Sequence, residues 1–377
     1  MKKIALIGST GSIGKQVLNV VRRYKEEFSI VSLAGGENVD LLQAQINEFC
    51  PAVACSKNYF MPSSKAKVEY FFGENAFTNA IIDSADIVVV ALVGFKGILA
   101  VLDCINKGKN IALANKESLV VGGRMVMELA KEKGVNIYPI DSEHSAIWQA
   151  LSFDFNKPFN KLLITASGGA FRDLSDEQLN SVTAKDALMH PNWNMGAKIT
   201  VDCATLVNKA FEVIEAKWLY NTSFNKIDVI MHRESIIHSM VEYIDGSVIA
   251  QMSYPTMEIP IQMALTYPNR LKCNNLGLDL AKLGKLSFSE LNREKYPAFE
   301  LVINSAKNGG VYPAIANGAN DSAVKLFLQD KIAFKDIYRA IDGALCAYNQ
   351  NFNDDIEGLL LANDFANAFV KDMFGVK

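Results

Sequence analysis

The sequence lacks a strong excess of either charge. Its 377 residues carry 38 lysines and arginines against 41 aspartates and glutamates, which gives a net charge of −3. This balance excludes strongly basic nucleic-acid-binding proteins and polybasic proteins of membrane surfaces. Half of the residues are hydrophobic and only 21% are charged, so intrinsic disorder is excluded as well.

Long hydrophobic runs, histidines and paired cysteines are also scarce. The longest strongly apolar segment covers residues 87–95, whereas a membrane span needs about 20 residues. The apolar residues after the N-terminal Met-Lys-Lys are soon interrupted by glycines and Lys15, unlike a secretory signal. The six cysteines form no CxxC pair and do not cluster with the four histidines, which predicts reduced thiols without structural zinc. We therefore expect a cytoplasmic protein with no membrane or nucleic-acid partner.

Short apolar strands alternate with helical segments over residues 1–140. Strands separated by helices are typical of βαβ units and a mostly parallel sheet, so the fold class is α/β. The predicted strands cover residues 4–7, 29–33, 52–55, 68–71, 87–91, 110–113 and 136–139.

Residues 141–265 predict an α+β domain with one helix over 204–220. Its strands are expected at 161–166, 228–231, 239–243 and 247–252, and the Asp245-Gly246 pair predicts a hairpin between the last two. Residues 266–292, which include Asn274 and Asn275, are expected to form an irregular linker. Residues 293–377 predict a C-terminal helical bundle with helices over 297–308, 313–329, 334–348 and 354–371.

A glycine-rich loop follows the first predicted strand. Gly8, Gly11 and Gly14 would allow a tight turn and bring backbone amides close to a pyrophosphate at a helix N-terminus. The alternative is a structural turn, because the spacing is GxxGxxG rather than GxGxxG. After the second strand, Glu37 would suit the ribose hydroxyls of NAD. Its small or polar neighbours, in contrast, leave room for the phosphate of NADP. The residues of this loop are therefore compatible with either NAD or NADP.

Two carboxylates follow the last strand of the first domain. If the chain stays extended, Asp141 and Glu143 share one face and would suit a hard cation such as Mg²⁺ or Mn²⁺. The alternative is the start of a helix, with Asp141 or Ser142 as its N-cap.

Three further segments carry polar residues suited to a ligand. The helix over 204–220 places Asn208, Lys209 and Glu212 on one face, which would otherwise be a solvated surface. The turn over residues 165–171 has small and hydroxyl-bearing residues that suit an anion. The loop over residues 190–196 has a tryptophan and a methionine and would suit a mobile lid, although its histidine could be structural.

Taken together, these segments resemble the 1-deoxy-D-xylulose-5-phosphate reductoisomerase family. The resemblance covers the whole chain and is specific because seven motifs occur in one order. They are residues 8–14, 114–118, 141–144, 165–169, 190–193, Asn208-Lys209 with Glu212, and 267–270.

The resemblance implies a Rossmann-type N-terminal domain, a catalytic α+β domain that forms a homodimer, and a C-terminal helical bundle. It implies NADPH as cofactor, with contacts from Thr10, Gly11, Ser12, Ile13, Gly36, Glu37, Asn38, Asn115, Glu117 and Gly196. The divalent cation would be bound by Asp141, Glu143 and Glu212. The sugar phosphate would be held by Lys116, Ser142, Glu143, Ser167, His190, Cys203, Asn208, Lys209 and Glu212. Of these, the catalytic residues would be Lys116, Glu143, His190 and Glu212, and the lid would carry Trp193 and Met195.

Two positions depart from the family pattern. The family usually has a basic residue near Glu37, and it has serine where this chain has Cys203.

The implied reaction is a metal-dependent rearrangement of 1-deoxy-D-xylulose 5-phosphate. Reduction by NADPH then gives 2-C-methyl-D-erythritol 4-phosphate for non-mevalonate isoprenoid synthesis. Two other classes would fit parts of the pattern. One is a metal-free semialdehyde dehydrogenase with a cysteine nucleophile, and the other is a regulator that binds NADP(H) without turnover.

Overall fold

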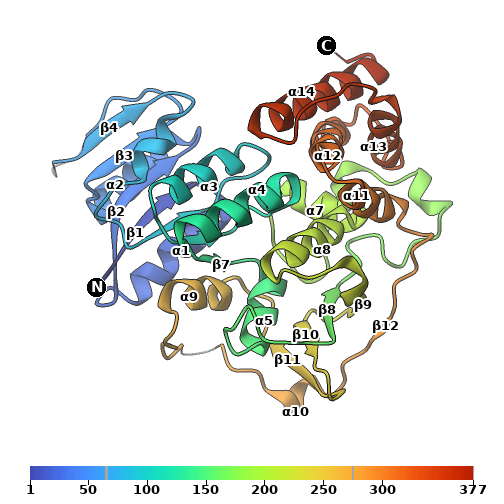
Figure 1. Ribbon diagram of the computed structural model, residues 1–377, viewed down its shortest axis with the longest axis horizontal. Helices are drawn as coiled ribbons and strands as arrows, with labels where there is room; N and C mark the ends of the chain where they lie inside the picture. Colours follow the sequence, from blue (N-terminus) through green and yellow to red (C-terminus); the bar gives the residue numbers. More distant parts are fainter. Residues whose placement is uncertain (64–66, 274–275, 377) are drawn as a thin grey trace. The chain divides into compact units, whose positions relative to one another are not determined.

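The computed structural model describes residues 1–63, 67–273 and 276–376 (Figure 1). Internal contacts divide the chain into two compact units. The first unit comprises residues 1–118, 125–145 and 257–273, and the second comprises residues 119–124, 146–256 and 274–377. None of the helices in the described ranges is long and apolar enough to cross a membrane.

The first unit is built on a seven-stranded parallel sheet. Its strands follow the order β4-β3-β2-β1-β5-β6-β7, and neighbouring strands all pair in parallel. The strand bounds are β1 Lys2–Ile7, β2 Phe28–Gly35, β3 Val53–Ser56, β4 Glu69–Phe72, β5 Ile87–Val90, β6 Ile111–Leu113 and β7 Ile137–Pro139. All seven predicted strands are confirmed, with ends that differ by one or two residues. This order reverses direction between β1 and β5, which is the position where doubly wound sheets bind their ligands.

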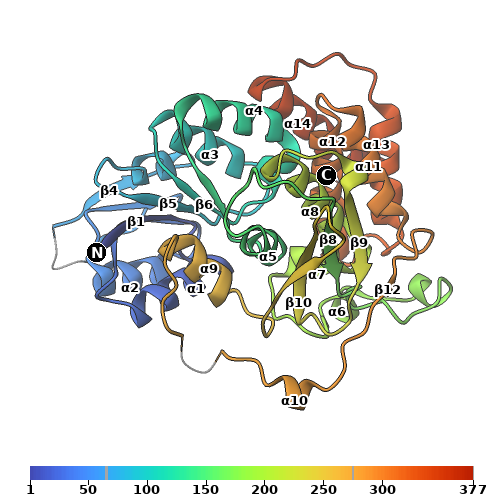
Figure 2. The same ribbon diagram turned by 60° about the horizontal axis from the view of Figure 1, so that its bottom comes forward.

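Helices cover both faces of this sheet, as Figure 2 shows. One face is covered by α1 (Ser12–Arg23), α2 (Val39–Phe49) and α9 (Glu258–Thr266). The other is covered by α3 (Gly97–Asn106) and by α4 (Glu117–Lys133) from its residue 125 onward. Apolar residues of β1, β2 and β5 form a continuous core with those of α1, α2 and α9.

Helix α9 changes the expected boundary between the first two regions. We expected residues up to 265 in the α+β domain, but Ile261, Ala264 and Leu265 lie in the core of the first unit. Lys2 Nζ also donates a hydrogen bond of 2.7 Å to the carbonyl of Leu265. An apolar helix can be recognised from sequence, but which sheet it covers is decided by tertiary packing.

The second unit contains a mixed five-stranded sheet. Its order is β11-β10-β8-β9-β12, in which β8 and β9 pair in parallel and the other pairs are antiparallel. The bounds are β8 Lys161–Ala166, β9 Ile227–Met231, β10 Ile237–Glu242, β11 Val248–Met252 and β12 Ser289–Glu290. The hairpin between β10 and β11 is confirmed, with Gly246 at a φ of 82° in its turn.

The predicted helix over residues 204–220 is wrong at its start. Two helices occupy this region, α7 (Ala197–Thr205) and α8 (Val207–Leu219), because Leu206 between them has a left-handed φ of 59°. Thr205 Oγ1 accepts a hydrogen bond of 3.3 Å from the amide of Val207 at the start of α8. The break was missed because no glycine or asparagine marks the left-handed residue.

The four C-terminal helices are confirmed and form a bundle within the second unit. They are α11 (Pro297–Asn308), α12 (Tyr312–Leu328), α13 (Asp336–Ala347) and α14 (Ile356–Met373). Helix α12 contacts the other three, and α11 also contacts α8. The bundle therefore supports the helix that carries Asn208, Lys209 and Glu212.

The expected linker over residues 266–292 contains more structure than predicted. It begins with a cis peptide bond at Tyr267-Pro268 and includes the short helix α10 (Leu280–Leu283) and β12. Asn274 and Asn275 lie outside the described residues. The remaining short elements are α5 (Ser142–Ala150), α6 (Ala184–Ala187) and three 3₁₀ helices at Ala76–Ala80, Gln178–Asn180 and Phe224–Lys226.

Candidate functional site

The glycine-rich loop follows the central strand β1 at the carboxyl edge of the parallel sheet. Gly8 has a φ of 92°, and a Cβ there would lie 2.4 Å from the carbonyl oxygen of Ala91. A Cβ on Gly14 would lie 2.2 Å from the carbonyl oxygen of Gly8. Gly11 is the N-cap residue of α1, and no side chain caps this helix N-terminus. The loop is therefore compact and presents helix-terminal amides, which are the groups that bind a pyrophosphate.

The end of β2 lies beside this loop. Thr10 Oγ1 accepts a hydrogen bond of 3.3 Å from the amide of Gly36. Glu37 is largely exposed, with its carboxylate 3.8 Å from Lys57 Nζ. The side chain of Asn38 caps α2 by accepting a hydrogen bond of 3.0 Å from the amide of Leu41. The predicted cofactor residues of β1 and β2 therefore lie together.

Asn115 and Glu117, also predicted to contact the cofactor, hold a neighbouring loop in place. Asn115 Nδ2 donates to the carbonyls of Leu92 and Gly94 and to Glu117 Oε2, at 3.0–3.1 Å. The amide of Gly94 donates to Glu117 Oε1 at 3.1 Å. Both side chains are buried. Their hydrogen bonds shape the loop after β5, next to the position where the strand order reverses.

The acidic segment after β7 begins a helix rather than continuing the strand. The amide of Ser145 donates to the carbonyl of Asp141 at 2.8 Å, and Ser142 is the first residue of α5. The extended conformation that we considered is therefore wrong, and the helix start is confirmed. The carboxylates of Asp141 and Glu143 nonetheless lie within 4.8 Å of each other. Ser142 Oγ donates to Glu143 Oε2 at 2.5 Å.

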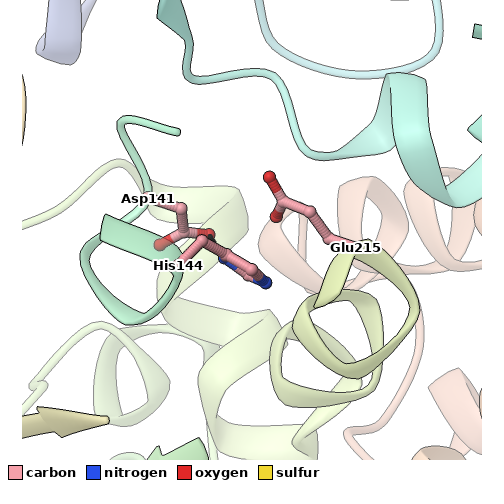
Figure 3. Close-up of side chains that lie close together, drawn as sticks. All are labelled: Asp141, His144 and Glu215. Atoms are coloured by element: carbon pink, nitrogen blue, oxygen red, sulfur yellow. Dashed lines mark ion pairs between the residues drawn. The ribbon is translucent and has the colours of Figure 1, made fainter. Parts of the chain in front are cut away.

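Asp141 is surrounded by basic groups of its own unit. Lys116 Nζ lies 2.5 Å from Asp141 Oδ2, and both side chains are nearly buried. His144 Nδ1 lies 3.9 Å from the same oxygen, and Figure 3 shows these two side chains next to each other. Figure 3 also shows Glu215, a buried carboxylate of α8 in the second unit. His144 and Glu215 were not predicted, although His144 lies within a motif that we quoted.

The polar face of α8 is buried, so the alternative of a solvated surface is wrong. Asn208, Lys209 and Glu212 are 7%, 4% and 1% exposed. Lys209 Nζ forms an ion pair with Glu212 Oε2, and Asn208 Nδ2 donates to Glu212 Oε1 at 2.6 Å. Burial of a charged side chain is costly in free energy unless the charge is paired, so buried charged residues are rare and often belong to a functional site.

The turn after β8 holds Ser167 against His190. Ser167 Oγ lies 3.1 Å from His190 Nε2. His190 Nδ1 accepts hydrogen bonds from the amides of Asn192 and Trp193, at 3.2 and 3.0 Å. Because Nδ1 accepts, the proton of the neutral ring is on Nε2, which donates to Ser167. Burial and the nearby charge of Arg172 lower the pKa of His190 to about 4, so the ring is neutral at physiological pH.

Gly168 and Gly169 allow this turn to approach α7. Both have positive φ angles, and a Cβ on Gly169 would lie 2.4 Å from the carbonyl oxygen of Cys203. Cys203, which precedes the predicted helix over residues 204–220, is in the last turn of α7. Arg172 Nη1 donates to the carbonyl of Ser167 at 3.1 Å, a supporting role that no motif indicated.

The loop over residues 190–196 is attached to the second sheet. Asn192 Nδ2 donates to the carbonyl of Arg233 and to Ser235 Oγ, at 2.6 and 2.7 Å. Trp193 is half-buried, with its ring 5.8 Å from that of His238 in an edge-to-face contact. The protein itself therefore covers part of this tryptophan. Met195 is half-buried, and Gly196 is the N-cap residue of α7.

The parallel sheet and its glycine loop define the class of this protein. It has a domain of the dinucleotide-binding class, together with a second α+β unit that carries further polar residues. Three family models match successive regions of the chain. They are described as 1-deoxy-D-xylulose 5-phosphate reductoisomerase for residues 4–123, its C-terminal domain for 137–220, and DXP reductoisomerase C-terminal domain for 252–368.

Curated relatives and solved structures agree with this match. The 1-deoxy-D-xylulose 5-phosphate reductoisomerase of Exiguobacterium sibiricum is 44% identical over 99% of both chains, and that of Shouchella clausii is 46% identical over 95% of this chain and 96% of its own. A crystal structure of DOX-P reductoisomerase in complex with NADPH, fosmidomycin and magnesium is 36% identical, covers 100% of this chain and 98% of its own, and has a TM-score of 0.94. The enzyme from Zymomonas mobilis in complex with NADPH is 33% identical over 99% of both chains, with a TM-score of 0.89.

The chain belongs to the 1-deoxy-D-xylulose 5-phosphate reductoisomerase family. The family resemblance expected from the seven motifs is thus confirmed. Membership decides against the semialdehyde dehydrogenase and the non-catalytic regulator, because the relatives match over nearly their full length.

Proposed function

We propose that this protein converts 1-deoxy-D-xylulose 5-phosphate to 2-C-methyl-D-erythritol 4-phosphate with NADPH and a divalent cation. One observation carries the proposal. A dinucleotide-type loop after β1, a buried lysine after β6 and two neighbouring carboxylates after β7 all follow carboxyl ends of one parallel sheet. The carboxyl ends of parallel strands are where such sheets bind ligands.

The residues of the first unit fit NADPH and a hard cation. The turn from Gly8 to Gly14 is packed against backbone atoms that a Cβ at either end would meet, and it would present the N-terminal amides of α1 to a pyrophosphate. Asp141 and Glu143 offer carboxylate oxygens within 4.8 Å, which is the donor type that Mg²⁺ and Mn²⁺ prefer. We assign Glu212 of the second unit as the third ligand.

The cation, when bound, would polarise the substrate carbonyl as a Lewis acid. Lys116 forms an ion pair with Asp141, and its ammonium would compete with the cation for this carboxylate. Ser142 would orient Glu143 through their hydrogen bond.

The second unit supplies groups suited to the sugar phosphate. His190, held neutral with its proton on Nε2, would donate a hydrogen bond to a phosphate oxygen together with Ser167. Lys209 and Asn208 would add a charge and an amide from α8, and Cys203 a thiol from α7. Such contacts are remote from the reacting carbons, and their binding energy would position these carbons for the reaction. Trp193 and Met195 would close over the substrate and exclude water.

The test is NADPH oxidation with 1-deoxy-D-xylulose 5-phosphate, followed by absorbance. Activity should be lost in EDTA and restored by Mg²⁺ or Mn²⁺. Glu212→Gln should bind NADPH but be nearly inactive, whereas Glu357→Gln, at an exposed position of α14, should be fully active. Full activity in thorough EDTA, or in Glu212→Gln, would contradict the metal assignment.

We also propose a cytoplasmic homodimer that forms through the β10–β11 hairpin. β11 is at the edge of its sheet, and Ile244, Val248 and Ile249 of the hairpin are 78%, 47% and 48% exposed. Exposed apolar residues on an unpaired edge strand favour association with a second copy of the chain. Light scattering should give a dimer mass for the wild type and a monomer mass for Ile249→Asp. A monomeric wild type would contradict this interface.

A further inference from the structure

We propose that Lys57 binds the 2′-phosphate of NADPH and thereby supplies a cation that the cofactor loop itself lacks. This inference rests on the proposed function, because it takes NADPH to be the cofactor. It explains how a chain with a glutamate after β2 can use the phosphorylated dinucleotide.

The end of β2 is where doubly wound folds distinguish the two dinucleotides. An acidic residue there accepts hydrogen bonds from the ribose hydroxyls of NAD, whereas a basic residue accommodates the phosphate of NADP. In this chain the position carries Glu37, whose side chain is 79% exposed. A Cβ on Gly36 would have no atom within 4 Å, so there is space beside the chain. Taken alone, Glu37 would repel a 2′-phosphate.

Strands β2 and β3 are neighbours in the sheet (Figure 1), and their register brings a lysine next to the end of β2. Gly35 is the register partner of Ser56, so Gly36 and Lys57 follow the two strands side by side. Ser56 Oγ donates a hydrogen bond of 3.4 Å to the carbonyl of Gly36, which joins the two strand ends. Lys57 Nζ lies 3.8 Å from the carboxylate of Glu37.

The ion pairs of Lys57 are loose and half-exposed. Its ammonium lies 3.4 Å from Glu74, which also pairs with Lys96, and the side chain of Lys57 is 47% exposed. Ion pairs of this length and exposure are weak, whereas charge-assisted hydrogen bonds are shorter, at about 2.7–2.9 Å. Lys57 can therefore turn toward a phosphate that carries more negative charge than one carboxylate. Its proximity also offsets the charge of Glu37.

The experiment measures cofactor binding in the absence of substrate. Dissociation constants for NADPH, NADH and 2′,5′-ADP are determined by calorimetry for the wild type, Lys57→Met, Lys57→Arg and Lys161→Met. Lys161 is a matched control, because it is a lysine of similar exposure (41%) that pairs with Asp228 in the second unit.

Lys57→Met should weaken NADPH and 2′,5′-ADP by about tenfold, as expected for loss of a hydrogen bond between charged groups. NADH should change by less than about twofold, because it lacks the phosphate. Lys57→Arg should retain the preference, and Lys161→Met should match the wild type. The inference would be overturned if Lys57→Met had the same ratio of NADPH to NADH affinity as the wild type, whether neither affinity changed or both fell equally.

The two proposals fail in different ways. A wild type that binds neither dinucleotide, or does not oxidise NADPH with the sugar phosphate, contradicts the proposed function. A wild type that prefers NADPH and keeps that preference in Lys57→Met contradicts only the role of Lys57.

Discussion

Replacement of Lys116 by methionine should destabilise the metal-free protein and increase its response to Mg²⁺. Lys116 and Asp141 form an ion pair of 2.5 Å, with side chains only 9% and 12% exposed. Removal of one partner of a buried pair costs about 3–5 kcal/mol, because the other charge loses its compensation. Since Asp141 keeps some contact with solvent, we expect about 3 kcal/mol, which corresponds to a melting temperature lower by about 6–12 °C for a domain of about 150–250 residues.

Magnesium should reverse much of this loss if Asp141 is a metal ligand. A ligand at 100 times its dissociation constant stabilises the folded state by about 2.7 kcal/mol. In the wild type the ion must compete with the ammonium of Lys116, so the stabilisation by Mg²⁺ should be smaller than in Lys116→Met. Melting curves recorded by circular dichroism in EDTA and in saturating Mg²⁺ measure both effects.

Lys161→Met is the control for loss of a surface charge. Lys161 lies 2.7 Å from Asp228, but the two side chains are 41% and 45% exposed, so the pair should contribute only about 0–1 kcal/mol. Lys116→Arg, which keeps the charge, should be less destabilised than Lys116→Met. The reasoning is refuted if Lys116→Met melts like the wild type in EDTA. An equal Mg²⁺ response in both proteins would place the ion away from Asp141.

Two further predictions concern the second unit. The pKa of His190 is lowered to about 4, below the ordinary value of 6.5 in the unfolded chain, so its contribution to stability should be complete above about pH 6.5 and decline as the pH falls toward 4. The ring protons of His190 should not titrate in NMR spectra between pH 8 and 5.5, and a transition near 6.5 would contradict the hydrogen bonds at Nδ1. Cys203→Ser should leave kcat nearly unchanged and lower KM for the sugar phosphate by at most about tenfold, as one hydrogen bond allows, whereas Lys209→Ala should raise it more than tenfold. Steady-state kinetics check both, and loss of activity in a folded Cys203→Ser would show that the sulfur has a role that a hydroxyl cannot fill.

The sequence by itself determined the order and type of most elements. Strand alternation, glycines at helix ends and the Asp-Gly hairpin are local signals, because backbone conformation there depends on residues close in the chain. The glycine loop after β1 and the helix-start alternative for Asp141 could also be recognised for this reason. The family resemblance rested on the order of short motifs, which needs no tertiary information.

Tertiary structure decided which segments that are distant in the sequence lie next to each other. Leu206 adopts a left-handed conformation that leucine alone does not indicate, and this separates α7 from α8. Helix α9 returns to the first sheet, although its apolar residues would suit either one. Glu37 appeared to lack a basic neighbour, and strand pairing brings Lys57 to it from 20 positions away. Each depends on packing or pairing between distant segments, whose free energy is gained only when the whole unit folds, so no local pattern could indicate it.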